Sequence, residues 1–352
     1  MNDIDAIVRD IFCGPDRPPV VIAELSGNHN QSYESAVDMV RAASKAGVTA
    51  IKLQTYTADT LTIDIEAPPF TIDDPKSLWH GRSLYNLYEQ AYTPWDWHEG
   101  LMSEAKKLGM LCFSTPFDES AVEFLEQLDV PCFKIASFEN NHIPLIEKVS
   151  QTGKPLMIST GLSSFSDIAD AVEVARANGC KDLVLMKCTS AYPTQPQDVN
   201  LSVIPHMAKM FDCPVGISDH TVGIGAAIGA VALGATAIEK HMKLNVSDDT
   251  VDSEFSESPE SFSVLVKEAR CAWQAIGSAS YEASLAEQPS AIFKRSIYAV
   301  EDMGAGTILT AKNTRIIRPS GGLAPKHWHK IIGREITKEV KRGTPITWDV
   351  FE

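Results

Sequence analysis

Short apolar runs alternate with longer segments of helical periodicity from Val20 to about Ile276, and this alternation limits the possible folds more than any other feature of the sequence. Each run has the length and composition of a buried strand, and each is followed by an amphipathic segment that fits a helix. The runs cover residues 20–25, 50–56, 110–116, 132–137, 155–161, 183–189, 214–220 and 237–242. Eight such strand–helix repeats predict an α/β protein built on a closed (β/α)8 barrel, the TIM barrel.

The connection after the second strand is unusually long. It spans residues 57–94, whereas connections of this kind usually have about two to six residues. Loops that follow barrel strands form the active sites of this fold. We therefore expect this segment to be a lid or a substrate-binding loop.

The pattern changes after Gly277. Residues 279–291 have the composition of a linker, and short apolar runs separated by Gly and Asn turns follow. We therefore expect a barrel domain over residues 1–278, the linker 279–291 and a small domain over residues 292–352. A domain of that size buries only a small apolar core, so we expect it to pack against a partner.

The net charge of the 352-residue chain is −15, which disfavours nucleic acid and anionic membranes as partners. The sequence begins without the basic flank and apolar run of a signal peptide, and no run of about 18 apolar residues could span a membrane. A soluble, cytoplasmic protein is the expectation.

Seven scattered cysteines form no C-x-x-C pair, which argues against a disulfide framework and against a thiolate metal site. We expect most of them to be small apolar residues of the strands. They are Cys13, Cys112, Cys132, Cys180, Cys188, Cys213 and Cys271.

Charged side chains enter the barrel from its first two strands. Successive strand residues face opposite sides, so Glu24 shares the inward face with Ile22, and Lys52 shares it with Gln54. A buried charge is costly unless a partner or a ligand offsets it. Glu24 and Lys52 therefore form either a structural ion pair or part of a site, and the other polar strand ends favour a site.

Lysine and hydroxyl side chains end the next strands. Ser114 and Thr115 end the third run, and the fourth run carries Lys134 and Ser137. Two lysines that converge with Ser and Thr donors supply compact positive charge and directed hydrogen bonds. Lys52 and Lys134 with these hydroxyls predict a site for phosphate and carboxylate groups in an otherwise acidic protein.

Two histidines end neighbouring strands. His220 ends the seventh run and His241 lies at the end of the eighth, so both imidazoles emerge at the same level of the barrel. Imidazoles together with oxygens from water and substrate suit Mn, Co, Fe or Zn, and two protein ligands leave positions open for chemistry. Glu239 shares the inward face of His241, and Asp252 follows in the eighth loop, where either could orient water or substrate hydroxyls.

The segment CTSAYPTQP after the sixth strand brings Ser190 and Tyr192 to the same mouth. A tyrosine before proline is explained equally well as a turn residue that stacks on the proline ring. The segment therefore supports a site only together with the other strand ends.

Two other functional classes stay open at this point. A desolvated lysine, Lys52 or Lys134, could act as the nucleophile of a Schiff-base aldolase, which borohydride trapping with pyruvate would reveal. A non-catalytic sugar-binding protein with a degenerate barrel is the other class, and the number of polar strand ends disfavours it.

The ordered set of strand ends resembles a known family. The segments IAELSGNHN, IKLQTY, STPFD, FKIAS, STG, CTSAYPT, GISDHT and IEKHM are similar to those of the sialic acid synthase family, the phosphoenolpyruvate-dependent nonulosonic acid synthases. The segment RSIYAVEDMGAGTILTAKNTRIIRPSGGLAP resembles the antifreeze-like (SAF) domain of these enzymes. A single motif such as STG is common, but the ordered set is specific and covers nearly the whole chain.

The resemblance implies a metal-dependent transferase. The enol carbon of phosphoenolpyruvate would attack an open-chain amino-sugar aldehyde, water would add, and phosphate would leave by C–O cleavage. A divalent metal, Mn, Mg or Co, is implied as the cofactor on His220 and His241. The implied catalytic residues are Glu24, Lys52, His220 and His241, with Glu24 as the candidate base for the water.

Substrate contacts and a dimer are also implied. The candidate phosphoenolpyruvate contacts are Lys52, Thr115, Lys134, Ser137, Ser190 and Ser218, and Ser190 stands where sialate synthases have Asn. The candidate sugar contacts are Gln54, Glu139, Tyr192, Glu239, Asp252 and Arg318. Family members form domain-swapped homodimers, in which the residue matching Arg318 contacts the sugar bound to the partner.

Within the family, ELSGNHN, LWHGRSLYNLYEQAYTPWDWH and VDSEFSESPESF are most similar to the pseudaminate-forming branch. That branch uses 2,4-diacetamido-2,4,6-trideoxy-altrose as the acceptor, and its product is destined for flagellin or a surface polysaccharide. Synthases of N-acetylneuraminate or legionaminate are the alternatives.

Overall fold

The computed structural model of the protein describes residues 8, 11–12 and 14–352, so Cys13 lies outside the described residues. The chain divides into two compact units, Met1–Gly277 and Ser278–Glu352. Among the described cysteines none forms a disulfide, and four of them are buried as small core residues: Cys112, Cys132, Cys180 and Cys188.

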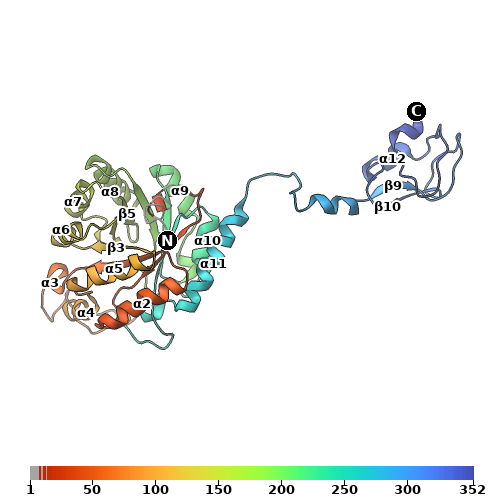
Figure 1. Ribbon diagram of the computed structural model, residues 1–352. Helices are drawn as coiled ribbons and strands as arrows, with labels where there is room; N and C mark the ends of the chain where they lie inside the picture. The colour runs from red at the N-terminus through yellow and green to blue at the C-terminus, as the bar shows by residue number, and fades with distance from the viewer. Residues whose placement is uncertain (1–7, 9–10, 13) are drawn as a thin grey trace. The chain divides into compact units, whose positions relative to one another are not determined.

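Eight parallel strands close the barrel of the first unit, which confirms the predicted fold (Figure 1). Each strand pairs with its neighbours in sequence, and the first strand closes the barrel by pairing with the eighth. The strands are β1 (Val20–Glu24), β2 (Ala50–Thr55), β3 (Leu111–Pro116), β4 (Phe133–Ile135), β5 (Leu156–Ser159), β6 (Leu183–Cys188), β7 (Val215–Asp219) and β8 (Ala237–His241).

The barrel lumen changes from apolar to charged along the strands. Inward side chains such as Ile22, Phe113 and Met186 form a buried apolar cluster. Farther along, the register pairs Glu24 of β1 with Lys52 of β2 on one side and with His241 of β8 on the other. Apolar packing therefore supports a polar layer at the carboxyl ends of the strands, where this fold places its chemistry.

Amphipathic helices cover the barrel and form the outer core with the outward strand residues. In the first helix, Met39 and Val40 are buried, while Ser32 caps the amino terminus by accepting a hydrogen bond from Ser35 N. The helices are α2 (Tyr33–Lys45), α5 (His98–Lys107), α6 (Glu119–Gln127), α7 (Ile143–Gln151), α8 (Phe165–Ala177), α9 (Val203–Phe211), α10 (Gly225–Ala232) and α11 (Pro259–Ile276). None of the described helices has the length and apolar character needed to cross a membrane.

The long connection after β2 has structure of its own. It contains α3 (Ala58–Leu61) and α4 (Leu84–Ala91), and a single bridge joins Thr71 to Ser83. Trp79 Nε1 donates to the carbonyl of Val251 at 3.0 Å, and this hydrogen bond links the long connection to the loop after β8.

The second unit has an independent apolar core. β9 (Ser296–Ala299) and β10 (Thr314–Ile317) form an antiparallel pair, and α12 (Trp328–Ile331) follows. Ile297, Leu309 and Ile346 are fully buried in the core of this unit. The short strands and Gly turns of the sequence are thus parts of one small domain.

Candidate active site

A cavity of about 470 Å³ opens at the barrel mouth and gathers most of the predicted site. Eleven of the predicted residues line it: Lys52, Gln54, Lys134, Ser137, Glu139, Tyr192, Ser218, His220, Glu239, His241 and Asp252. Glu24 and Thr115 lie behind the lining as partners of Lys52. Ser190 lines a neighbouring cavity, and Arg318 belongs to the second unit.

Two lysines and two carboxylates form an ionic network inside the barrel. Lys52 Nζ lies 2.9 Å from Glu24 Oε2 and 3.4 Å from Glu239 Oε1. Lys134 Nζ lies 3.2 Å from Glu239 Oε2. All four side chains are buried. Glu24 and Lys52 are therefore an ion pair, but one that belongs to a larger network facing the cavity.

The network changes the pKa values of its members in different directions. Burial raises the pKa of Glu24, and Lys52 offsets this only in part. Burial also disfavours charge on Glu239, but Lys134 and Lys52 together hold its pKa below the ordinary value. Burial lowers the pKa of Lys134 despite Glu239, whereas the two carboxylates outweigh burial and raise the pKa of Lys52. A bound anion would restore the charge that burial disfavours on Lys134.

Hydroxyl groups surround the two ammonium groups. Thr115 Oγ1 accepts a hydrogen bond from Lys52 Nζ at 3.2 Å, and Ser218 Oγ donates to Glu239 Oε1 at 3.1 Å. Ser114 does not join them, because its hydroxyl is 2.6 Å from that of Thr55 on the helix-facing side of the strand. Adjacent strand residues face opposite sides, so only one of the two hydroxyls can enter the barrel.

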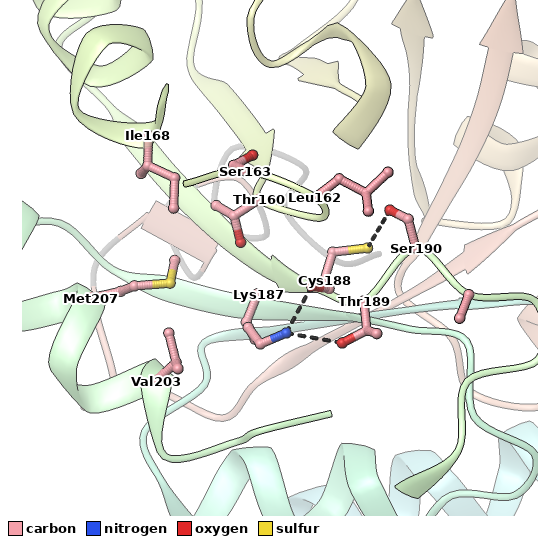
Figure 2. Close-up of a pocket in the computed structure, with 11 residues that line it drawn as sticks. Thr160, Leu162, Ser163, Ile168, Lys187, Cys188, Thr189, Ser190, Val203 and Met207 are labelled. Carbon is pink, nitrogen blue, oxygen red and sulfur yellow. Dashed lines mark hydrogen bonds between the residues drawn. The ribbon is translucent and has the colours of Figure 1, made fainter. Parts of the chain in front are cut away.

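A glycine shapes the wall between the two cavities. Gly161 N donates to Ser137 Oγ at 3.1 Å, and a Cβ at this position would collide with the hydroxyls of Ser137 and Ser190. Ser190 lies at the edge of the neighbouring cavity, close to Cys188 (Figure 2). The absence of a side chain at Gly161 lets both hydroxyls approach its backbone.

The imidazoles of His220 and His241 lie side by side with centroids 5.3 Å apart. His220 Nδ1 is 3.1 Å from the carbonyl of Thr189, and a carbonyl can only accept, so Nδ1 carries a proton. The same nitrogen lies 3.9 Å from Cys188 Sγ, and this contact outweighs burial and raises the pKa of His220. Burial and the neighbouring His220 hold the pKa of His241 well below its ordinary value, so this ring is neutral. His241 Nδ1 has no hydrogen-bond partner.

These two rings fit a divalent metal. Neutral imidazole is a common metal ligand, and the unpartnered buried nitrogen of His241 lacks the contact that a metal would supply. The described residues contain no group of three or more His, Cys, Asp or Glu side chains with metal-site spacing. The protein ligands would therefore be His220 and His241, with water and substrate completing the coordination.

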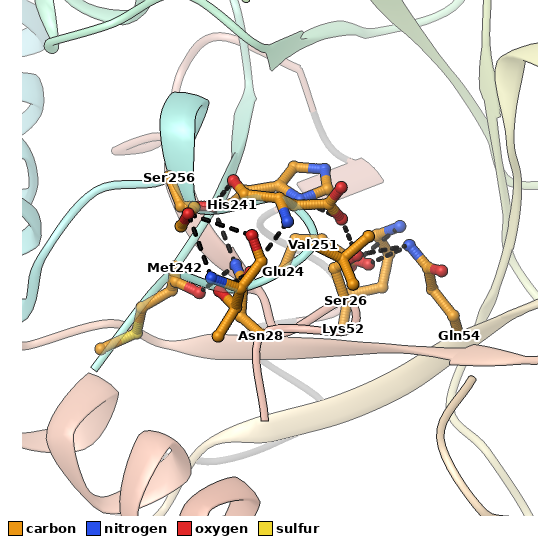
Figure 3. Close-up of polar contacts among 12 residues, drawn as sticks. Glu24, Ser26, Asn28, Lys52, Gln54, His241, Met242, Val251 and Ser256 are labelled. Atoms are coloured by element: carbon orange, nitrogen blue, oxygen red, sulfur yellow. Dashed lines mark hydrogen bonds and ion pairs between the residues drawn. The ribbon is translucent and has the colours of Figure 1, made fainter. Parts of the chain in front are cut away.

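A buried amide fixes the loop that carries Asp252. Asn28 Nδ2 donates to Met242 O and to Ser256 Oγ, both at 2.8 Å, while its Oδ1 accepts from Thr250 Oγ1 at 2.7 Å (Figure 3). The same Oδ1 accepts from the backbone of Asp252 at 3.3 Å. Every hydrogen-bonding position of this amide is used, so Asn28 holds the whole turn after β8.

The β1 loop also contacts the Asp252 carboxylate directly. Ser26 Oγ donates to Asp252 Oδ2, and the same oxygen lies 3.6 Å from His241 Nδ1. Burial raises the pKa of Asp252, although Ser26 opposes this increase. Asp252 is thus a positioned carboxyl group beside one of the two imidazoles.

Aromatic side chains form one wall of the cavity. The Tyr192 ring lies 4.6 Å from His220, 5.1 Å from Phe255 and 5.8 Å from Trp79, measured between centroids. Tyr192 therefore does more than stack on the following proline. Further apolar lining, Ile72, Leu84 and Leu87, comes from the long connection after β2, which agrees with its expected role as a substrate loop.

One oxygen of the Glu139 carboxyl group has no partner. Its Oε2 is buried and makes no hydrogen bond, and burial raises the pKa of Glu139 to about 7. Lys134 and Lys52 oppose this increase only weakly. Near neutral pH this group can therefore either give or take a proton.

Several contributors were missed from the sequence. Ser26 and Asn28 lie in the segment SGNHN, and Phe255 lies in VDSEF, where no strand alternation indicates direction. Trp79 lies in the long connection, for which only a general role was predicted. The dense run of Asn, Ser and Gly after β1 is the signal that could have indicated a hydrogen-bonding loop.

The model of the NeuB family matches residues 39–281, and the model of the SAF domain matches residues 294–352. A pseudaminic acid synthase of Campylobacter jejuni is 39% identical over 96% of this chain and 98% of its own length. One of Helicobacter pylori is 38% identical over the same shares. The crystal structure of an N-acetylneuraminic acid synthetase from Leptospira borgpetersenii matches with a TM-score of 0.69 at 29% identity, covering 78% of this chain and 90% of that chain.

Proposed function

The chain belongs to the NeuB family, and on that basis we propose that it is a pseudaminic acid synthase. It would condense phosphoenolpyruvate with 2,4-diacetamido-2,4,6-trideoxy-β-L-altropyranose and water, giving pseudaminate and phosphate. The pseudaminic acid synthases of Campylobacter jejuni and Helicobacter pylori are 38–39% identical to this protein over nearly the whole chain. The observation that carries the chemistry is the meeting of two lysines and two imidazoles in one cavity.

Phosphoenolpyruvate would bind at Lys52 and Lys134. Both ammonium groups face the cavity, and Ser137 and Ser218 add hydroxyls nearby. Glu239 neutralises the charge of the two lysines when no anion is bound. Phosphoenolpyruvate would compete with Glu239 for these ammonium groups. Thr115 would support this arrangement through its hydrogen bond with Lys52.

His220 and His241 would hold the divalent metal, for which Mn, Mg and Co are the candidates. When bound, the metal would supply charge stabilisation at the aldehyde oxygen as negative charge develops there. Thr189 orients His220 through its carbonyl, and Asp252 lies beside His241. Loss of metal binding together with activity in His241→Ala would support this assignment.

The proton-handling residue has two candidates. Glu24 is fully buried behind Lys52 and accepts a hydrogen bond from Gln54 at 2.8 Å, so any water that it activates must lie next to these partners. Glu139 has a free oxygen and a pKa of about 7, which suits an acid or base at neutral pH. Glu24→Gln should keep metal and phosphoenolpyruvate binding but lose most turnover; near-normal turnover would reassign the role to Glu139.

The acceptor would lie against the aromatic wall. A 6-deoxy sugar with two acetamido groups carries more apolar surface than a hexose, and Trp79, Tyr192 and Phe255 offer rings for that surface. Gln54, Glu139, Glu239 and Asp252 would supply the polar contacts. Ser190 would reach the phosphate only from the edge of the cavity.

The reaction can be tested with a panel of acceptors. Incubation with phosphoenolpyruvate, a divalent metal and each amino-sugar aldehyde should release phosphate fastest with the proposed acceptor, and mass spectrometry identifies the product. Preference for an N-acetylneuraminate or legionaminate precursor would change the product. Borohydride trapping of pyruvate on the enzyme would instead favour a Schiff-base aldolase, for which the lowered pKa of Lys134 is suitable.

We also propose an oligomeric state and a cellular location for the enzyme. We expect a domain-swapped homodimer in which Arg318, an exposed residue of the second unit, reaches the partner's sugar site. We also expect a cytoplasmic enzyme, because phosphoenolpyruvate is a metabolite of the cytoplasm, with a product used on flagellin or a surface polysaccharide. Light scattering of the purified protein tests the dimer, and a monomer would remove the role of Arg318.

A further inference from the structure

Lys187 is a buried lysine that the proposed reaction does not use. It lies on β6 with Leu183 and Leu185, whose side chains pack in the outer core between the barrel and its helices. Only 9% of Lys187 is exposed. An ammonium group on this otherwise apolar face is costly, so its contacts should explain why it is there.

No carboxylate neutralises this ammonium group. Among the described residues Lys187 forms no ion pair, and burial lowers its pKa. It lines a cavity of about 420 Å³ together with Ile168 of α8 and with Val203 and Met207 of α9 (Figure 2). This is the neighbouring cavity that Ser190 also lines, and it is called the outer cavity below. The cavity gives small molecules access to the ammonium group from outside the barrel.

The two contacts of Lys187 both lie in the turn that follows β6. Its Nζ donates to the carbonyl of Cys188 at 2.7 Å and to Thr189 Oγ1 at 3.0 Å (Figure 2). Thr189 Oγ1 donates a hydrogen bond to the carbonyl of Asp198 at 3.3 Å. The lysine therefore fixes the conformation of Thr189 from the outer side of the strand.

Thr189 in turn contacts the candidate metal site. Its carbonyl accepts the Nδ1 proton of His220 at 3.1 Å and the hydroxyl proton of Thr194 at 3.1 Å. The first of these bonds decides which nitrogen of His220 is protonated and which way the ring points. The path from the outer cavity to the imidazole is thus Lys187, Thr189, His220.

We propose that Lys187 is a positioning residue for His220, acting from outside the barrel through the Cys188–Thr189 turn. The ammonium group holds this turn so that the Thr189 carbonyl keeps the Nε2 lone pair of His220 available at the barrel mouth. The inference rests on the proposed metal role of His220. Loss of the hydrogen bond that orients a metal-binding histidine typically weakens metal binding about 10- to 100-fold. Lys187 acts on that bond through Thr189.

Lys187→Met tests the contact because it keeps the length of the side chain and removes the donor. Mn²⁺ binding, measured by the electron paramagnetic resonance signal of free Mn²⁺, should weaken about 10- to 100-fold. Lys181→Met makes the same change at an exposed position just before β6 and should bind Mn²⁺ like the unaltered protein. Unchanged Mn²⁺ affinity in folded Lys187→Met would overturn the proposal.

The metal-free protein offers a readout that a general packing defect would not move. At a pH high enough to keep the His220 ring neutral, its imidazole ¹⁵N chemical shifts should report the Nδ1-protonated form in the unaltered protein and a mixture of tautomers in Lys187→Met. The same tautomer in both proteins would contradict the positioning role.

Chemical rescue covers the case in which Lys187→Met does not fold. Lys187→Ala leaves the outer cavity open to ethylammonium, which should restore Mn²⁺ affinity in a saturable way and should have no effect on Lys181→Ala. A folded Lys187→Ala that lost affinity and did not respond to alkylammonium ions would count against the ammonium group as the acting element.

A parallel His220→Ala protein separates this inference from the proposed function. If His220→Ala binds Mn²⁺ normally, the metal role of His220 and the inference about Lys187 both fail. If His220→Ala loses Mn²⁺ while Lys187→Met keeps it, only the inference about Lys187 fails.

Discussion

Two buried ionic clusters meet at β8, where Glu239 faces the inside of the barrel and Lys240 faces the helices. Lys240 Nζ points toward the helices and lies 3.0 Å from Asp219 Oδ2 and 2.6 Å from Thr221 O. Asp219 Oδ1 accepts from Thr221 N at 2.9 Å, so this cluster is closed. In the inward cluster, Glu24 and Glu239 pair with Lys52 and Lys134, and three of the four side chains, Lys52, Lys134 and Glu239, line the cavity.

Burial is the same in the two clusters, so burial does not separate structure from function. The difference lies in access: the outward pair is closed within the protein, whereas Lys52, Lys134 and Glu239 of the inward network line a cavity that a ligand can enter. A closed buried pair is expected to matter for stability, and an open one for binding. The same Lys→Met substitution in each cluster tests whether one affects stability and the other affects binding.

The largest effect is expected from Lys240→Met on the helix-facing side. It leaves Asp219 buried without a countercharge, which should reduce the free energy of unfolding by about 3–5 kcal/mol. Denaturant titration followed by circular dichroism measures this loss. The folded fraction should retain a kcat/KM for phosphoenolpyruvate within a few-fold of the unaltered enzyme.

A double variant supplies the control for that prediction. Asp219→Asn with Lys240→Met removes both charges, so most of the lost stability should return. If the double variant is less stable than Lys240→Met alone, the unpaired carboxylate is not the cause of the loss.

The same substitution in the inward network, Lys134→Met, should act mainly on catalysis. Removing one partner of a desolvated charge pair costs about 2–5 kcal/mol of binding, so kcat/KM for phosphoenolpyruvate should fall about 10²- to 10³-fold. Steady-state kinetics and calorimetric binding of phosphoenolpyruvate measure the effect. A loss of stability as large as that of Lys240→Met, with binding intact, would reverse the assignment of the two clusters.

The sequence predicted the barrel well because local chemistry determines it. Each buried strand combines a β-branched or apolar run with a following amphipathic helix, and all eight predicted strands are present. Strand alternation also gave the correct direction for Glu24, Lys52, Glu239 and His241. These residues lie on regular strands, where side-chain direction follows from position alone.

Alternation fails once the chain leaves the strands. The Asn28 side chain bonds residues more than 200 positions away in sequence, and its contacts depend on loop geometry rather than on periodicity. Ser114 shows the other limit, since two adjacent hydroxyls were expected at one site although a strand can point only one of them inward. An enclosed ion pair and one that lines a cavity look the same in the sequence, because tertiary contacts decide which side chains a ligand can reach.

A pH series tests whether an unsaturated carboxyl of the cavity differs from an exposed one. Burial raises the pKa of Glu139 from 4.5 to about 7, so the folded state binds this proton more tightly than the unfolded chain. The resulting stability is fully present below about pH 4.5 and is lost as the pH rises through about 7, by at most about 1.4 kcal/mol per pH unit. Glu139→Gln should therefore gain stability relative to the unaltered protein across this window.

The control for the pH series is Glu119→Gln, which makes the same change at an exposed position. The stability of Glu119→Gln relative to the unaltered protein gives the background for a surface substitution at each pH. A difference for Glu139→Gln that does not change with pH would show that burial of Glu139 does not raise its pKa.

The smallest effect is expected at the saturated amide of Asn28, which is buried and holds the loop that carries Asp252. Asn28→Asp keeps the shape of the side chain but loses the donations to Met242 O and Ser256 Oγ, which should loosen the turn that carries Asp252. A lost buried hydrogen bond costs about 1–3 kcal/mol, so KM for the sugar should rise about tenfold, with KM for phosphoenolpyruvate nearly unchanged. Asn30→Asp makes the same change at an exposed position of the same loop and should alter neither constant. Equal increases in both KM values would mean that Asn28 supports the whole barrel mouth, and that a saturated group can serve binding as directly as an unsaturated one.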